Sequence, residues 1–180
     1  ITAYAMNNEL FKKIVSTKRY VLHRSSDECG QVILNKNKLL SSFEGANGVK
    51  TGYTKKAGRC LVSSATRDDM TVIAVTLDCG PMFEECSRLM KYAFDNYEMR
   101  DLSPKGTIAY CCNGSGSKTF ALGTTESVRY PVRKDGSERP GYGICDVKIA
   151  GDGAKIGDEN GKLNIYLDKR LIFSQKLFII

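Results

Sequence analysis

The spacing of apolar residues predicts two amphipathic helices in the first hundred residues. In residues 2–16 apolar side chains recur every three or four positions after Thr2, which can act as an N-cap. In residues 81–100 a proline at position 81 suits a first helical turn, and one apolar stripe follows it. Each helix therefore has one face that must pack against another element.

Extended segments lie between the two helices. Short ones at 19–24 and 31–35 flank a polar turn at 25–30. Three longer ones follow a Gly-rich cluster, and their short connections predict an antiparallel meander over 49–54, 59–65 and 70–78. Apolar residues occupy both alternating sets of the third segment, so we expect helices to cover both faces of this sheet.

The composition changes near residue 101. Of the 17 glycines, 11 fall in the last 80 residues, whereas all five methionines fall in the first 100. Short extended segments separated by Gly-rich turns predict an all-β sandwich. These segments are 106–112, 118–122, 127–132, 142–149, 162–168 and 170–179. We therefore expect an α+β chain with two domains, residues 1–101 and 102–180.

The charge is basic but evenly spread. The 27 Lys and Arg residues against 20 Asp and Glu give a net charge of +7, and both halves of the chain share the excess. A nucleic-acid-binding protein concentrates its basic residues on one face or arm, so this pattern argues against nucleic acid as a partner. Attraction to an anionic wall or membrane surface fits it better.

The cysteines predict neither a metal site nor a disulfide framework. There are seven of them and a single histidine, with no C-x-x-C pair, so zinc has no suitable ligand set. The adjacent Cys111 and Cys112 would make a poor disulfide, and we expect most of the cysteines to be core thiols. A structural zinc site is therefore not expected.

Lys50, Thr51 and Gly52 form the tripeptide with the most chemical content. The lysine offers a cation and the threonine a hydroxyl. The glycine has no Cβ, so another backbone can lie close to the strand. Together these residues can hold a substrate carboxylate beside a strand.

The sequence around this tripeptide resembles the serine D-alanyl-D-alanine carboxypeptidases, the low-molecular-mass penicillin-binding proteins that trim peptidoglycan stem peptides. The stretches that carry the resemblance are Asn37-Lys38-Leu39-Leu40, residues 45–54 and residues 57–65. Residues 2–6 are similar to the helix that follows the family's second motif, although Ala5 stands where the family commonly has Asp. The resemblance implies a partial β-lactamase/transpeptidase-like domain, an antiparallel sheet with helices, over 1–101 and the family's C-terminal β-sandwich over 102–180.

Such enzymes use Ser-x-x-Lys, Ser-x-Asn and Lys-Thr-Gly, in that order. This sequence has Lys-Thr-Gly and no Ser-x-Asn. Its one Ser-x-x-Lys, at 115–118, follows Lys-Thr-Gly and lies in a Gly-rich turn, so we interpret it as a chance match. The chain begins at Ile1 rather than Met, and we expect it to be the C-terminal portion of the enzyme, without the nucleophile and inactive by itself.

The resemblance assigns roles to four consecutive residues. Lys50 and Thr51, the catalytic candidates, would bind the terminal D-alanine carboxylate, and Lys50 would also face the serine of the missing second motif. The substrate backbone would lie across Gly52, and the N–H of Tyr53 would be one of two oxyanion donors. His23 is interpreted as an ordinary surface residue. For Lys36 a role near the carboxylate pocket and a solvated loop position stay open.

The resemblance also implies partners and a compartment. The partners are peptidoglycan stem peptides, β-lactams, and either the missing N-terminal half of the enzyme or a swapped copy. No cofactor is implied. The compartment is the outer face of the bacterial cytoplasmic membrane, with peripheral membrane association as a further expectation. The alternatives are a serine β-lactamase-like hydrolase, against which the added β domain argues, and a non-catalytic structural or binding fragment.

Overall fold

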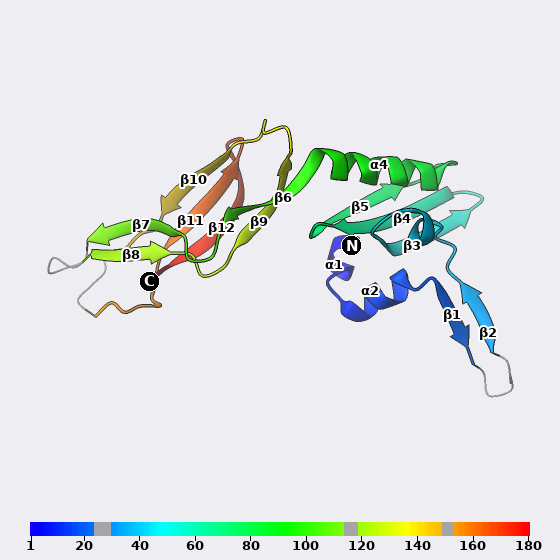
Figure 1. Cartoon of the computed structure of the whole chain (residues 1–180), viewed down its shortest axis with the longest axis horizontal. Coiled ribbons are helices and arrows are strands. Elements are labelled where there is room, and N and C mark those ends of the chain that lie inside the picture. The colour runs from blue at the N-terminus through cyan, green and yellow to red at the C-terminus, as the bar shows by residue number, and fades with distance from the viewer. Residues whose placement is uncertain (24–29, 114–118, 149–152) are drawn as a thin grey trace. The chain divides into compact units, whose positions relative to one another are not determined.

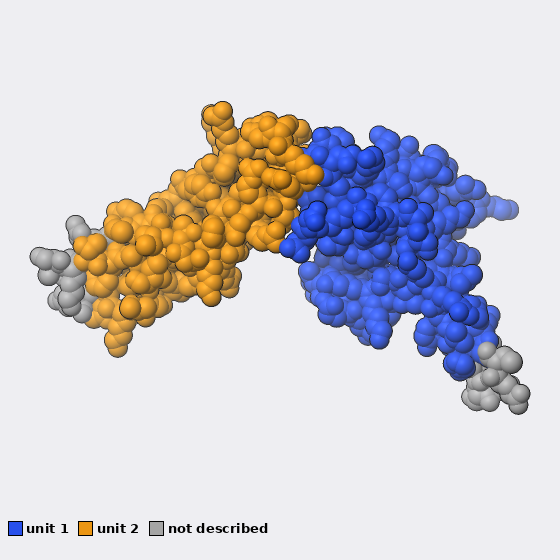
Figure 2. All heavy atoms as spheres, viewed as in Figure 1, with its two compact units in different colours: residues 1–96 blue, residues 97–180 orange. Residues whose placement is uncertain are grey.

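A computed structural model describes residues 1–23, 30–113, 119–148 and 153–180. Most of the expected turn at 25–30 and the whole of the Ser-x-x-Lys match at 115–118 lie outside these residues. The chain forms two compact units, residues 1–96 and residues 97–180, each described by itself (Figure 2). Within the described residues, no helix is long and apolar enough to cross a membrane.

The first unit has four helices among its described residues: α1 (Thr2–Ala5), α2 (Glu9–Ser16), α3 (Leu39–Ser42) and α4 (Met82–Asn96). The single helix predicted over 2–16 is wrong, because two helices occupy this stretch. The side chain of Asn8 accepts a hydrogen bond from the N–H of Phe11 at 3.0 Å and caps α2. A capping asparagine favours a new helix start over continuation, and its effect here outweighs the apolar spacing.

The strands of the first unit form a hairpin and a three-stranded sheet (Figure 1). The hairpin pairs β1 (Arg19–Leu22) with β2 (Gln31–Leu34). The sheet has the antiparallel order β3-β4-β5, formed by β3 (Ala46–Thr54), β4 (Gly58–Arg67) and β5 (Met70–Thr76). The predicted meander is confirmed.

Different helices lie against the two faces of this sheet. Helix α4 runs along β4 and β5 (Figure 1), and the hydroxyl of Thr76 lies 3.6 Å from the thiol of Cys86. Helix α2 meets the opposite face at Gly48, where an added Cβ would lie 3.0 Å from Val15. Val75, on that second face, is 53% exposed, so the cover expected on both faces is incomplete on the α2 side.

One arginine joins the sheet to α4 and to the residue that follows α3. The guanidinium of Arg67, at the end of β4, lies 4.7 Å from the ring centroids of both Phe43 and Phe94. Its Nε donates to the carbonyl of Glu44 at 3.0 Å. This arrangement joins α4 to the segment that leads into β3.

The second unit consists of two antiparallel sheets (Figure 1). A five-stranded sheet has the order β10-β11-β12-β8-β7, and β6 (Tyr97–Ser103) pairs with β9 (Val128–Arg133). The strands of the larger sheet are β7 (Ile108–Asn113), β8 (Thr119–Gly123), β10 (Pro140–Cys145), β11 (Glu159–Leu167) and β12 (Arg170–Ile179). Leu102 and Val132, from the β6–β9 pair, lie in one hydrophobic core with Leu122, Ile165 and Leu177 from the larger sheet. The predicted fold class, an α+β part followed by an all-β sandwich, is confirmed.

The segment 97–103 differs from the sequence-based expectation. The second helix was expected to end near Arg100, whereas α4 ends at Asn96 and the next residues form β6. These residues pair with β9, about thirty positions further along the chain, from Tyr97 with Arg133 onwards. The two units divide at 96/97 rather than at 101/102, because this pairing draws the strand into the second unit.

The cysteines are less buried than expected. Of the five whose state the structure describes, Cys86 alone is buried, Cys111 is exposed, and Cys60, Cys79 and Cys145 are partly buried. All five are free thiols. The expectation that most cysteines are core thiols is therefore wrong for this group.

Candidate functional site: an edge strand with Lys50, Thr51 and Gly52

The tripeptide lies on β3, which is an edge strand. β3 pairs with β4 on one side, and no strand pairs with its other edge within the part of the chain that the structure describes. Lys50, Gly52 and Tyr53 are exposed and Thr51 is partly buried. The backbone and side chains of this segment are thus accessible to a ligand.

Alternation along the strand divides the four residues between two faces. Lys50 and Gly52 lie opposite Val62 and Cys60, whereas Thr51 and Tyr53 belong to the other face. The Nζ of Lys50 donates a hydrogen bond to the carbonyl oxygen of Thr51, so the ammonium group lies beside its own strand. The cation of Lys50 and the hydroxyl of Thr51 thus start from opposite faces of the sheet, and the hydrogen bond to the Thr51 carbonyl keeps the ammonium group close to the strand.

The packing of the described residues does not require a glycine at position 52. A Cβ added there would meet Cys60 alone, at an ordinary contact distance of 3.9 Å. An alanine would therefore fit at this position without disturbing the described part of the structure. The open space beside Gly52 is the feature that a closely approaching ligand backbone would use.

A buried asparagine holds the start of β3. The side chain of Asn37 is 3% exposed, and its Nδ2 donates to the carbonyl of Gly48 at 2.8 Å. Its Oδ1 accepts from the N–H of Leu39 at 3.2 Å. Asn37 thereby ties the segment before α3 to the strand, two residues ahead of Lys50. The sequence contained Asn37 in the family-like stretch, but only the structure shows this positioning role.

A second set of polar contacts fixes the same end of the strand. The Oγ of Ser64 donates to the Oδ1 of Asn47 at 2.6 Å, and the Nδ2 of Asn47 donates to the hydroxyl of Thr66 at 2.8 Å. Gly45 has a φ of +78°, and a Cβ there would overlap the carbonyl oxygen of Thr66. The turn cluster before the strand is thus built for one conformation.

Other candidate residues gain no catalytic surroundings. His23 and Lys36 are exposed, and neither forms an ion pair within the described residues. No group of three His, Cys, Asp or Glu side chains among these residues could hold a metal ion.

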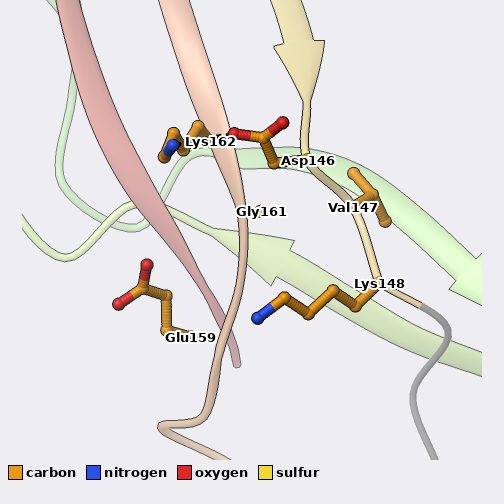
Figure 3. A pocket seen from close by; sticks show the side chains of 6 residues that line it. All are labelled: Asp146, Val147, Lys148, Glu159, Gly161 and Lys162. Carbon is orange, nitrogen blue, oxygen red and sulfur yellow. Dashed lines mark hydrogen bonds and ion pairs between the residues drawn. The ribbon is translucent and has the colours of Figure 1, made fainter.

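A hollow of about 450 Å³ in the second unit is lined mainly by charged residues, including Lys148 and Glu159 (Figure 3). Lys162 and Asp146 form an ion pair there at 2.7 Å, and the hydrogen bond from Lys162, followed by its charge, lowers the pKa of Asp146. The described lining contains no nucleophile with an adjacent base, so this hollow does not have the composition of a hydrolase site.

Comparison with known proteins identifies a family for the first part of the chain. Residues 1–80, which contain the whole of β3, match the family model described as D-alanyl-D-alanine carboxypeptidase. The family resemblance is confirmed over these residues. The chain is 30% identical to D-alanyl-D-alanine carboxypeptidase DacF of Bacillus subtilis over 131 residues, which cover 70% of this chain and 33% of that protein. It is 40% identical to a D-alanyl-D-alanine carboxypeptidase of Streptomyces sp. strain K15 over 101 residues, which cover 52% of this chain and 35% of the relative.

Solved structures show the same fold. Penicillin binding protein 5 from Haemophilus influenzae matches 99% of this chain with a TM-score of 0.70 and 23% identity, over 53% of its own length. A peptidoglycan synthesis regulatory factor, PBP3, from Streptococcus pneumoniae matches 98% of this chain with a TM-score of 0.71 and 21% identity, also over 53% of its length. The chain thus spans about a third of the two curated relatives and about half of these two structures.

Proposed function

We propose that this chain provides the Lys-Thr-Gly strand and the β-sandwich of a serine-type D-alanyl-D-alanine carboxypeptidase. The observation that carries the proposal is the position of Lys50, Thr51 and Gly52 on an exposed edge strand within the residues that match the family. An edge strand can bind an extended peptide by main-chain hydrogen bonds, and the side chains beside it supply specificity.

In this proposal Lys50 and Thr51 bind the carboxylate of the terminal D-alanine. A cation and a hydroxyl on adjacent residues give charge-assisted hydrogen bonds to a carboxylate. The substrate backbone runs antiparallel to β3 across Gly52, where the chain leaves room for it. The N–H of Tyr53 then donates to the oxyanion that forms on the scissile carbonyl.

In this proposal the nucleophilic serine comes from a Ser-x-x-Lys motif outside the 180 residues of this sequence. A serine from Ser-x-x-Lys attacks the carbonyl of the penultimate D-alanine, the terminal D-alanine leaves, and water hydrolyses the acyl-enzyme. β-Lactams acylate the same serine. Below, "intact enzyme" means the protein that carries this chain together with the two serine motifs.

An apolar groove in the first unit supports the proposal that a complementary half, or a swapped copy, completes the catalytic domain. Leu10 and Ile14 of α2 are 66% and 63% exposed, and Tyr20 and Ile33 of the β1–β2 hairpin are 58% and 46% exposed. They line a groove of about 520 Å³. A two-stranded hairpin with exposed apolar residues is marginal by itself, so we infer that a partner segment covers it.

The proposed substrate sets the compartment. Peptidoglycan stem peptides and β-lactams meet such an enzyme at the outer face of the bacterial cytoplasmic membrane. The net charge of +7 favours peripheral association with an anionic surface there.

The test is release of D-alanine by the intact enzyme and its variants. Lys50→Ala and Thr51→Ala should each lower turnover about ten- to a hundredfold, since a charge-assisted contact contributes roughly 1.5–3 kcal/mol. His23→Ala, on an exposed residue outside β3, is the matched control. Wild-type turnover in the Lys50 variant would refute the assignment.

Covalent labelling by a penicillin should differ between the 180-residue chain and the intact enzyme. A fluorescent penicillin should label the intact enzyme and leave the 180-residue chain unlabelled, because the chain has no nucleophile motif in the required order. Stoichiometric labelling of the chain would contradict this, and its loss in Ser115→Ala would identify the serine responsible.

A further inference from the structure

Four cations lie along the β3–β4 hairpin without an acidic residue between them. Lys50, Lys55, Lys56 and Arg59 fall within ten residues, and the intervening positions contain no Asp or Glu. Residues 55–57 connect β3 to β4 at the tip of the hairpin. Lys55, Lys56 and Arg59 are all exposed, and we call these three residues the hairpin tip cations.

The described residues do not neutralise these charges. None of the hairpin tip cations forms an ion pair within the residues that the structure describes. Asp78 lies against Gly58 at the base of the hairpin, yet no ion pair joins it to the tip. By contrast, Lys12 and Lys91 elsewhere in the unit are each paired with a carboxylate on their own helix.

Local contacts hold the tip in one conformation. The hydroxyl of Thr54 accepts a hydrogen bond from the N–H of Ala57 at 2.9 Å. Gly58 has a φ of +64°, and a Cβ there would collide with the carboxylate of Asp78. The guanidinium of Arg59 donates to the carbonyl of Gly80 at 3.3 Å. The cations therefore stand on a fixed turn at the end of the proposed binding strand.

The spacing of residues along β3 shows which part of a bound peptide would lie near these cations. At about 3.4 Å per residue, Lys55 lies about 14 Å beyond Thr51 in the direction of the strand. A peptide that runs antiparallel to β3 with its C-terminal carboxylate at Thr51 extends its earlier residues towards the tip. The residues three to five positions before its C-terminus then come closest to Lys55 and Lys56.

We propose that two of the hairpin tip cations, Lys55 and Lys56, select peptides that carry a free carboxylate three to five residues before the terminal D-alanine. This inference rests on the proposed function, because it uses the antiparallel peptide on β3. Opposite charges at exposed sites contribute modestly and are screened by salt, so the selection is a preference rather than an absolute requirement.

The experiment compares two synthetic peptides on the intact enzyme. Both end in D-alanyl-D-alanine, and they differ at the fourth residue from the C-terminus, which carries either a carboxylate or a carboxamide. We expect kcat/KM to be about three- to tenfold higher for the carboxylate peptide at low ionic strength, and this ratio to shrink with added salt. The double variant Lys55→Gln, Lys56→Gln should reduce the ratio to about one.

Controls separate a local site from general attraction. Lys91→Gln on α4 also removes one exposed charge and should leave the ratio unchanged. A third peptide, with its carboxylate eight residues from the C-terminus, should behave like the carboxamide peptide. A ratio of one in the unmodified enzyme, or a ratio that persists in the double variant or with the displaced carboxylate, would overturn the inference. Failure to release D-alanine from any of the peptides would overturn the proposed function itself.

Discussion

Two neighbouring serines on β4, the strand that supports β3, should respond in opposite ways to the same substitution. Ser63 and Ser64 are both fully buried. The hydroxyl of Ser64 donates to Asn47 at 2.6 Å, whereas the hydroxyl of Ser63 has no hydrogen-bond partner among the residues that the structure describes. Both are serines in one strand, so changing each to alanine removes the same atom, and the two variants differ in whether that hydroxyl is hydrogen-bonded.

The magnitudes follow from these surroundings. Ser64→Ala removes a hydrogen bond and leaves the Asn47 oxygen without that donor, which should lower the free energy of unfolding of the first unit by about 1–2 kcal/mol. Ser63→Ala removes a hydroxyl whose burial without a partner costs about 1–3 kcal/mol, so the free energy of unfolding should stay the same or rise by about 1 kcal/mol.

Amide hydrogen exchange in the intact enzyme measures both effects. Exchange of the β4 and β5 amides reports the first unit, and residues 163–165 in the core of the second unit serve as an internal reference. A loss of protection in Ser63→Ala as large as that in Ser64→Ala would refute the reasoning, because it would mean that the Ser63 hydroxyl is satisfied.

Three further predictions concern packing, charge and the independence of the units. Arg67→Ala should lower the free energy of unfolding of the first unit by about 1–3 kcal/mol in a denaturant titration, because the planar guanidinium contacts two rings. Arg67→Lys should give an intermediate value, and an unchanged unfolding midpoint in Arg67→Ala would argue against this role. Lys162→Gln should raise the pKa of Asp146 in a carboxyl NMR titration. Because folding lowers this pKa, the pair contributes to the free energy of unfolding at a pH above the ordinary Asp pKa. This contribution is lost as the pH falls through the pKa of the folded state. In the isolated chain the amides of 165–167 should be strongly protected from exchange and those of 72–75 weakly protected until a complementary half is added; equal protection without a partner would show that the first unit is stable alone.

Local patterns in the sequence determined much of the fold. Alternating apolar residues and short polar connections were sufficient for the β3–β5 meander, because a hairpin is formed by residues close in sequence. Regularly spaced Gly-rich turns indicated the sandwich in the same way. The identity and order of Lys50, Thr51 and Gly52 were sufficient to propose a carboxylate-binding strand, and their roles remain predictions.

Tertiary structure decided what depends on residues far apart in the sequence. Residues 97–103 have no clear period, and they form a strand because β9 offers a pairing edge thirty positions later. Whether β3 is an inner or an edge strand is set by which strands pair, and so is the exposure of Lys50. Asn37 reaches Gly48 across eleven positions, a contact that no local pattern contains. The sequence by itself could identify the residues of the candidate site, whereas their accessibility and support come from long-range pairing and packing, which local periodicity does not encode.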